Sequence, residues 1–272
     1  MTTADTEALV ARLSTVLAQC APAAVAVSGG VDSMTLAHYA HSELDAAVTM
    51  YHAVSPAVPA AATARVRRHA ATYGWRLEIV GAGEFDDPDY RANPVDRCFY
   101  CKTNLYAALA RATDAQLLAG TNTDDLGDYR PGLRAAASAG VRHPFVEAGI
   151  DKAAVRALAR RRALTDLADL PASPCLSSRV ETGIRIDPAA LAFVDAAEQL
   201  VRETLATHTV RCRLRRSGIV IELDQEGLAA LDSSEQALRE ALAALASARG
   251  LGARPIDFAA YVMGSAFLRQ HA

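Results

Sequence analysis

A glycine-rich hexapeptide, Ser28-Gly29-Gly30-Val31-Asp32-Ser33, has the residue types and spacing of a phosphate-binding loop. It follows a short apolar run at 23–27 and precedes a helical pattern, which is the context that such a loop needs. Two adjacent glycines allow backbone N–H groups to face an anion, and Ser28 and Ser33 add hydroxyl donors. Asp32 supplies hard carboxylate oxygens, which suit Mg²⁺. The loop therefore predicts a nucleotide–Mg²⁺ site, with a Gly-Gly turn that binds nothing as the alternative.

Three of the five cysteines lie in patterns that suit sulfur chemistry or metal binding. Cys98 and Cys101 form a C-x-x-C motif at the predicted start of a helix, where backbone N–H groups favour thiolates. Cys175 stands on a proline-stiffened loop beside two serines and an arginine, which also favours a thiolate. Burial as a small apolar side chain is the alternative for Cys175. The other two, Cys20 and Cys212, belong to no motif.

Arg211, Arg213 and Arg215 alternate with apolar residues in a predicted strand. Because side chains two residues apart share one face of a strand, three guanidinium groups line up there. Such a row binds carboxylates or phosphates bidentately. Glu222 lies on the predicted partner strand, and Glu198 interrupts the apolar stripe of the preceding helix, where a carboxylate needs a partner. A solvated edge strand that its arginines protect from aggregation is the alternative.

The elements that must position these residues alternate between strand and helix in the first part of the chain. Strands are predicted over 23–27, 46–51, 75–80 and 114–119, and helices over 5–19, 34–39, 60–73, 97–112 and 151–162. This alternation predicts an α/β fold in which a parallel sheet has helices on both faces. Ligands of such sheets bind at the carboxyl ends of the strands, where the hexapeptide and Gly120-Thr121 both lie.

The composition shifts at 181–187, where we place a domain boundary. We expect a nucleotide-binding domain over 1–183 and a smaller C-terminal α+β domain for substrate binding or oligomerisation over 184–272. The C-terminal domain is predicted to contain a helix that begins at Asp187-Pro188, strands at 209–215 and 219–223, a helix at 234–248 and a last strand near 255–262.

The whole chain has 272 residues and a formal net charge of −3, which lacks the basic surplus of most nucleic-acid-binding proteins. A nucleic-acid partner is therefore disfavoured. Neither a membrane span nor the apolar core of a signal peptide is evident, so we expect a cytoplasmic protein without a membrane partner. In that reducing compartment the cysteines are expected to be thiols or metal ligands.

The hexapeptide resembles the PP-loop of the ATP pyrophosphatase family, whose members cleave ATP between the α- and β-phosphates and adenylate their substrate. A Walker A loop instead has a lysine directly before its hydroxyl residue, and this chain has Asp32 before Ser33. The loop therefore favours adenylation over γ-phosphate transfer.

Five segments together resemble the LarE family: the hexapeptide, NPVDRCFYCK at 93–102, GTNTDDLGDYRPG at 120–132, PASPCLSSR at 171–179 and VRCRLRRSGIVIEL at 210–223. LarE proteins are ATP-dependent sulfur transferases. They adenylate the carboxylates of pyridinium-3,5-biscarboxylic acid mononucleotide and replace them with thiocarboxylates, a step toward the nickel-pincer nucleotide cofactor of lactate racemase. The resemblance covers almost the whole chain. The sequence departs from the family pattern at 162–170 and at 185–186, and these differences affect how the substrate would fit.

The resemblance implies a role for each motif. ATP would be bound by Ser28, Gly29, Gly30, Asp32 and Ser33, with Gly120 and Thr121. The reacting centre would include Cys175 as the sulfur-handling residue, Asp32, Ser178 and Arg179. The substrate phosphate would be held by Arg211 and Arg213, with Glu198 and Glu222 close to that pocket. A homo-oligomer, with a hexamer as the expected form, is implied as well.

Two sulfur chemistries occur in the LarE family, and the cysteines distinguish them. Members with a single cysteine at the position of Cys175 sacrifice its sulfur, whereas others hold a 4Fe-4S cluster on three cysteines and carry a sulfide on the fourth iron. Because this chain has Cys98, Cys101 and Cys175, the resemblance favours the cluster, and no fourth protein ligand for a structural zinc site is apparent. Sacrifice of the Cys175 sulfur stays open as an alternative.

Two further hypotheses compete with this assignment. A PP-loop tRNA thiolase would also combine the hexapeptide with clustered cysteines, but it predicts a basic surface and an added RNA-binding module. A module that senses ATP without turnover is the non-enzymatic alternative, and the intact Asp32 and the three cysteines disfavour it.

Overall fold

The structure is a computed structural model that describes residues 3–127, 131–232 and 234–268. The chain forms two compact units. The first comprises Met1–Ser55, Ala60–Asp86 and Cys98–Ser173, and the second comprises Pro56–Pro59, Asp87–Arg97 and Pro174–Ala272. None of the helices in the described part of the chain is long and apolar enough to cross a membrane.

The first unit is built on a four-stranded parallel sheet with the strand order β3-β2-β1-β4. Its strands are β1 (Ala23–Ala26), β2 (Val48–Val54), β3 (Leu77–Gly81) and β4 (Gln116–Ala119). Each begins within two residues of the predicted start. The strands are short apolar runs that alternate with helices, so a parallel sheet covered on both faces is the arrangement that buries them.

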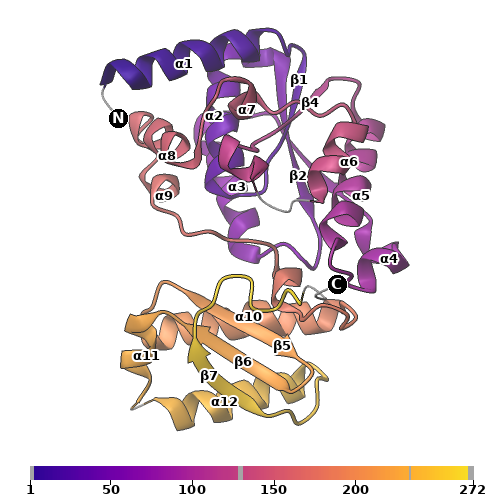
Figure 1. Cartoon of the computed structure of the whole chain (residues 1–272), viewed down its shortest axis with the longest axis vertical. Coiled ribbons are helices and arrows are strands. Elements are labelled where there is room, and N and C mark those ends of the chain that lie inside the picture. The colour runs from indigo at the N-terminus through magenta and orange to yellow at the C-terminus, as the bar shows by residue number, and fades with distance from the viewer. Residues whose placement is uncertain (1–2, 128–130, 233, 269–272) are drawn as a thin grey trace. The chain divides into compact units, whose positions relative to one another are not determined.

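Helices cover both faces of this sheet (Figure 1). One face packs against α1 (Thr3–Ala18), α2 (Val31–Leu44), α3 (Ala60–Tyr73), α8 (Lys152–Arg161) and α9 (Thr165–Ala168). The opposite face packs against α5 (Arg97–Ala112) and α6 (Gly132–Ser138). The alternation of strand side chains explains the two cores, because Ala24 belongs to one and Val25 to the other. The predicted α/β fold with helices on both faces is confirmed.

Strand order places a topological switch point between β1 and β4. From β1 the chain runs through α2 to β2 on one side, and after β3 it crosses back to β4 on the other side. Ala26 and Ala119 are register partners at the ends of these two neighbouring strands. The loops that leave β1 and β4 in opposite directions therefore border one crevice, which is where open α/β sheets bind their ligands.

Short helices complete the first unit: η1 (Asp45–Ala47), η2 (Glu84–Asp86), η3 (Thr123–Leu126) and α7 (Pro144–Glu147). Residues 128–130 of the predicted motif at 120–132 lie outside the described residues.

The second unit contains a three-stranded sheet with the order β5-β6-β7. Strands β5 (Val210–Arg215) and β6 (Gly218–Leu223) form an antiparallel hairpin, and β7 (Ile256–Ala260) pairs with β6 in parallel. Its helices are α4 (Pro88–Arg91), η4 (Leu176–Arg179), α10 (Pro188–Leu205), α11 (Gln225–Leu231) and α12 (Glu235–Ala248). The Asp187 carboxylate accepts hydrogen bonds from the N–H groups of Ala189 and Ala190, so it caps α10 as the sequence predicts.

Residues 174–183 belong to the second unit, whereas the sequence analysis placed them in the first domain. Hydrogen bonds explain where this segment packs. The hydroxyls of Tyr90 and Ser177 lie 2.6 Å apart, and the Asn93 amide donates to the carbonyl of Glu181 at 2.9 Å. These contacts join segments about ninety residues apart in sequence, which composition alone does not reveal.

Candidate functional site

The hexapeptide joins β1 to α2 and takes a conformation that requires glycine. Gly29 has φ +81°, and a Cβ at this position would lie 2.8 Å from the carbonyl oxygen of Ala62. Gly30 is the N-cap residue of α2 and has extended backbone. The strand–loop–helix arrangement that the sequence predicts is confirmed, and the loop precedes the positive end of a 14-residue helix.

Hydrogen bonds hold the two ends of the hexapeptide together. The Ser28 N–H donates to Ser33 Oγ at 3.0 Å, and the two serine hydroxyls also lie 3.0 Å apart. From α3, Arg65 donates to the Gly29 carbonyl at 2.7 Å. Hydrogen bonds within the protein therefore fix the shape of the loop, as an anion cradle built from backbone N–H groups needs.

The loop after β4 packs directly against the hexapeptide. A Cβ on Gly120 would lie 2.7 Å from the backbone nitrogen of Ser33, so only glycine allows this approach. Thr121 is half-buried beside it, and Asn122 is 2% exposed. The Asn122 amide donates to Asp32 Oδ1 at 3.1 Å, and its oxygen accepts from the Asp124 N–H at 3.0 Å. Gly120 and Thr121 thus border the hexapeptide, as predicted.

The second Asp32 oxygen, Oδ2, contacts the ammonium group of Lys152. Lys152 is the first residue of α8, and its backbone N–H donates to Asp124 at 3.3 Å. The side chains of Lys152 and Asp32 are 35% and 27% exposed. Sequence reasoning missed both Lys152 and Asn122. The signal for Lys152 was its rarity, because only two of the 28 Lys and Arg residues are lysines.

These groups give the hexapeptide the electrostatics of an anion site. The start of α2, the backbone N–H groups and the Lys152 ammonium all favour negative charge. The Asp32 carboxylate has the hard oxygens that Mg²⁺ prefers, so its chemistry fits that ion. A bound cation and the Lys152 ammonium would compete for the same oxygen.

Cys98 and Cys101 lie on the first turn of α5, as predicted, and both are half-buried. None of the five cysteines forms a disulfide in the structure. Two thiols three residues apart at a helix start fit as thiolate metal ligands. Within the described residues, no group of three or more His, Cys, Asp or Glu side chains is gathered to hold a metal ion. Cys98 and Cys101 belong to the first unit and Cys175 to the second, so their shared cluster stays a prediction.

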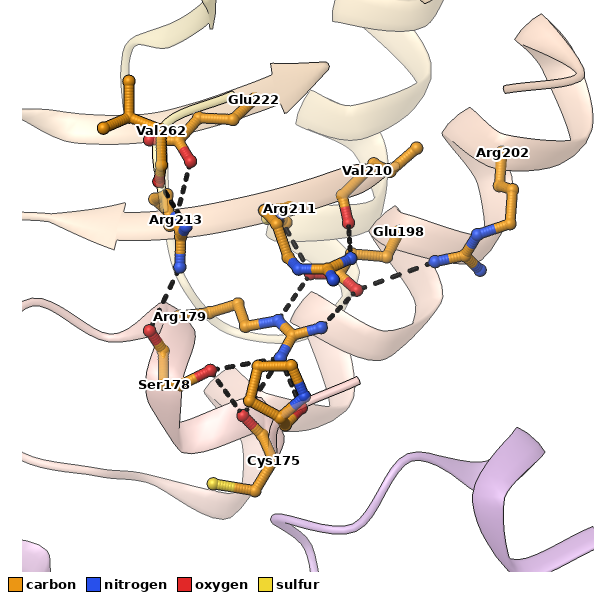
Figure 2. A network of polar contacts seen from close by, with 12 residues as sticks. Cys175, Ser178, Arg179, Glu198, Arg202, Val210, Arg211, Arg213, Glu222 and Val262 are labelled. Carbon is orange, nitrogen blue, oxygen red and sulfur yellow. Dashed lines mark hydrogen bonds and ion pairs between the residues drawn. The ribbon is translucent and has the colours of Figure 1, made fainter. Parts of the chain in front are cut away.

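In the second unit, Cys175 directly precedes the short helix η4 and is half-buried. Its carbonyl oxygen accepts hydrogen bonds from the Ser178 hydroxyl at 2.7 Å and from the Arg179 guanidinium at 3.1 Å. Figure 2 shows its sulfur pointing away from that guanidinium. The fully buried thiol that was the alternative for Cys175 is therefore wrong, and the backbone around the thiol is fixed.

Arg179 and Glu198 form a buried bidentate ion pair (Figure 2). The two hydrogen bonds measure 2.8 and 3.0 Å, and the side chains are 2% and 5% exposed. Glu198 also accepts from the Cys212 N–H at 3.1 Å. Burial opposes the charge on Arg179, but the hydrogen bonds that Arg179 donates to Glu198 and the negative charge of that carboxylate together raise the pKa of Arg179 above its ordinary value. Glu198 thus has the partner that its place on an apolar helix face requires.

Two of the three arginines in the row of β5 are buried and the third, Arg215, is half-buried, so the alternative of a solvated edge strand is wrong. Arg211 and Arg213 are 7% and 4% exposed. Arg213 donates to Glu222 at 2.8 Å and to the Ser178 carbonyl at 3.2 Å, and Arg215 donates to Glu222 at 2.9 Å. Desolvation by burial lowers the pKa of Arg211. The structure thus brings together six of the residues predicted for the reacting centre and the substrate: Cys175, Ser178, Arg179, Glu198, Arg213 and Glu222.

Comparisons with known proteins add to this geometry. No protein-family model matches the chain. The uncharacterized protein slr1717 of Synechocystis is 37% identical over 204 residues, which cover 74% of this chain and 75% of that protein. The pyridinium-3,5-bisthiocarboxylic acid mononucleotide synthase of Lactiplantibacillus plantarum is 36% identical over 140 residues, 50% of each chain. The uncharacterized protein MJ0830 of Methanocaldococcus jannaschii is 25% identical over 202 residues, 73% of this chain and 76% of that protein.

Fold and site together define an α/β protein with a phosphate-binding type of loop at its switch point and a second unit with a buried arginine network. By identity and coverage, the chain belongs to the same family as slr1717. Its similarity to the synthase over half of its length supports a LarE-like enzyme of the sulfur-transferase class.

Proposed function

We propose that this protein is an ATP-dependent sulfur transferase that converts the carboxylates of pyridinium-3,5-biscarboxylic acid mononucleotide into thiocarboxylates. The observation that carries the proposal is the 36% identity over 140 residues with a protein named as the synthase of the bisthiocarboxylic acid mononucleotide. The matched segment is half of either chain, so the substrate is part of the proposal.

The first step is adenylation at the hexapeptide. A substrate carboxylate oxygen attacks the α-phosphorus of ATP, a new P–O bond forms, and the bond to the β-phosphate breaks so that pyrophosphate leaves. The N–H groups at the start of α2 would bind the phosphate oxygens, and Asp32 would hold Mg²⁺, which would neutralise part of the phosphate charge. The product is an acyl adenylate, which is an activated acyl donor.

In the second step, a sulfide attacks the acyl carbon, a C–S bond forms, and the C–O bond to AMP breaks. The buried cations of β5 would bind the substrate phosphate through Arg211 and Arg213. Ser178 and Arg179 position the segment that carries Cys175, because both donate to its carbonyl oxygen. Their role in the proposal is to fix where the thiol lies.

The sulfide carrier is proposed to be bound by Cys98, Cys101 and Cys175. Half-buried thiols at a helix start and on a fixed loop suit thiolate ligands. A 4Fe-4S cluster on three thiolates would supply an open iron position for a sulfide. We propose in addition that the protein is cytoplasmic and assembles as a homo-oligomer.

The adenylation step is tested by product release. With ATP, Mg²⁺, sulfide and the biscarboxylate mononucleotide, we expect pyrophosphate and AMP to appear only when the mononucleotide is present. Asp32→Asn should slow this release by roughly two orders of magnitude, because the carboxylate that holds Mg²⁺ is lost. Asp169→Asn is the matched control, since Asp169 lies in the same unit and is 74% exposed. Pyrophosphate release that does not require the mononucleotide would contradict the proposal.

The sulfur source is tested by anaerobic purification. We expect brown protein that contains iron and labile sulfide, and Cys98→Ala should lose both. Cys20→Ala is the control, because Cys20 is buried in the core away from the C-x-x-C motif and should leave the iron content unchanged. Colourless protein that completes one turnover after anaerobic reconstitution would instead support sacrifice of the Cys175 sulfur.

A further inference from the structure

Lysine is rare in this chain, and one of its lysines lies at the hexapeptide. Of the 28 basic residues that carry a full positive charge, 26 are arginines, and Lys102 and Lys152 are the two lysines. Nearly all positively charged side chains of this chain are therefore arginines. A lysine ammonium is a compact charge on a flexible stem, whereas an arginine guanidinium is a planar fork. A lysine in this arginine-rich chain therefore suggests a role that needs a compact, movable charge.

The Lys152 ammonium contacts Oδ2 of Asp32, one of the two oxygens through which Asp32 could coordinate a metal ion. The Asn122 amide donates to the other oxygen, Oδ1, at 3.1 Å. Both carboxylate oxygens therefore have donors from the protein. A divalent cation can bind Oδ2 only after the ammonium leaves, because two positive charges at one oxygen repel each other.

The backbone around Lys152 is fixed while its side chain can move. Asp151 caps α8 by accepting from the Ala154 N–H at 2.7 Å, and the Lys152 N–H donates to Asp124. The side chain is 35% exposed and reaches Asp32 through a flexible four-carbon stem. Asn122 would keep Asp32 oriented after the ammonium leaves, since its amide contacts the other oxygen.

We propose that Lys152 is the lysine that binds the phosphates of a nucleotide at the hexapeptide. Its ammonium pairs with Asp32 before the nucleotide binds, and its side chain swings to the polyphosphate when Mg²⁺ binds Asp32. The inference rests on the proposed function, because it requires that the loop binds ATP. It also explains why the hexapeptide has an aspartate directly before Ser33, where a Walker A loop has its lysine. Here α8 supplies the ammonium from outside the loop.

The test compares two affinities of Lys152→Gln, each measured by titration calorimetry without the pyridinium substrate. Mg²⁺ alone should bind the variant more tightly than the wild type, because Asp32 has lost its competing ammonium. ATP with saturating Mg²⁺ should bind more weakly, by on the order of tenfold or more, because a charge-assisted contact to phosphate is lost. Lys152→Arg should recover part of the ATP affinity, since it retains the charge.

Arg160→Gln is the matched control, because Arg160 lies on the same helix with a side chain that is 56% exposed. It should change neither affinity. If Lys152→Gln weakens both ligands, Lys152 only maintains the loop and the inference is overturned. Equal ATP affinity of wild type and Lys152→Gln overturns this inference alone. Failure of the wild type to bind ATP overturns the proposed function with it. Circular dichroism of each variant checks the fold, and Lys152→Arg serves if Lys152→Gln does not fold.

Discussion

The ion pair of Arg179 and Glu198 is buried, with side chains that are only 2% and 5% exposed. Replacement of Glu198 by alanine leaves the Arg179 charge in a nearly dry environment and removes the acceptor of the Cys212 N–H. We expect the free energy of unfolding to fall by roughly 3–5 kcal/mol, which is the usual cost of an unpaired buried charge. Urea unfolding followed by far-UV circular dichroism measures this change.

Arg202→Ala is the control for this prediction. Arg202 contacts the same carboxylate at 3.7 Å, but its side chain is 43% exposed. An exposed partner contributes about 1 kcal/mol or less, because solvent screens the interaction. Equal losses for Glu198→Ala and Arg202→Ala would show that burial of the pair does not determine its energy.

At the residue scale, the sequence identified side chains but not their partners. Asp32 was predicted from the hexapeptide, whereas Asn122 and Lys152 lie 90 and 120 residues away along the chain. Such contacts depend on how β4 and α8 pack beside β1 and α2, which local patterns do not specify. For Glu198 the sequence predicted more, because a carboxylate on an apolar helix face needs a buried partner. It did not predict which residue that partner is.

At the scale of elements, a hydrogen-bonded chain of side chains links three helices of the first unit. His38 on α2 lies 2.9 Å from His69 on α3, which lies 2.9 Å from Asp166 on α9. Because a carboxylate only accepts, His69 Nε2–H donates to Asp166, and in a neutral His69 ring Nδ1 then accepts a hydrogen bond from His38 Nε2–H. Desolvation by burial lowers the pKa of His38 to about 3.

This arrangement predicts a loss of stability on acidification. The unfolded chain binds a proton at His38 near its ordinary pKa of 6.5, whereas the folded protein does so only near 3. The contribution of His38 to stability is therefore constant above about pH 6.5, and between about pH 6.5 and its folded pKa of about 3 each pH unit costs about 1.4 kcal/mol. Burial also lowers the pKa values of His52 and His143, which act in the same direction.

The measurement is the slope of unfolding free energy against pH between about pH 6.5 and pH 5. His38→Gln should make this slope shallower by roughly one proton, while the other buried histidines keep their share. His41→Gln is the control, because His41 lies on the same helix but is only half-buried. Identical slopes for wild type and His38→Gln would contradict the assignment of His38 as neutral in the folded protein.

Element boundaries were predictable because hydrophobic period and turn chemistry are local. The four strands of the first unit and the starts of the helices at 151 and 187 lie where the sequence predicts them, to within a few residues. The burial of β5 on both faces was not predictable, since alternation of arginine with valine, cysteine and leucine is also typical of a half-solvated strand. The structure shows Glu198 and Glu222 as the partners that allow it.

At the scale of the whole molecule, the net charge distinguishes the proposed small-molecule enzyme from a tRNA thiolase, which would need a basic surface. The chain has 28 Lys and Arg residues against 31 Asp and Glu residues, so its formal net charge is −3. Four of the arginines, Arg97, Arg179, Arg211 and Arg213, are at least nine-tenths buried and thus removed from the surface. Fewer cations are available to neutralise nucleic-acid phosphates than the composition suggests.

We therefore expect little or no tRNA binding at moderate salt. Fluorescence anisotropy of labelled tRNA, titrated with protein at about 50 and 200 mM salt, measures it, and any signal at the lower salt should vanish at the higher one. A nonspecific electrostatic contact loses affinity steeply with salt because it depends on counterion release, whereas a dedicated RNA site keeps base or shape contacts that salt does not screen. The same titration with the pyridinium mononucleotide present should leave the anisotropy unchanged. Submicromolar tRNA affinity at the higher salt would favour tRNA thiolation over the proposed substrate, because a near-neutral chain reaches it only through a built RNA site.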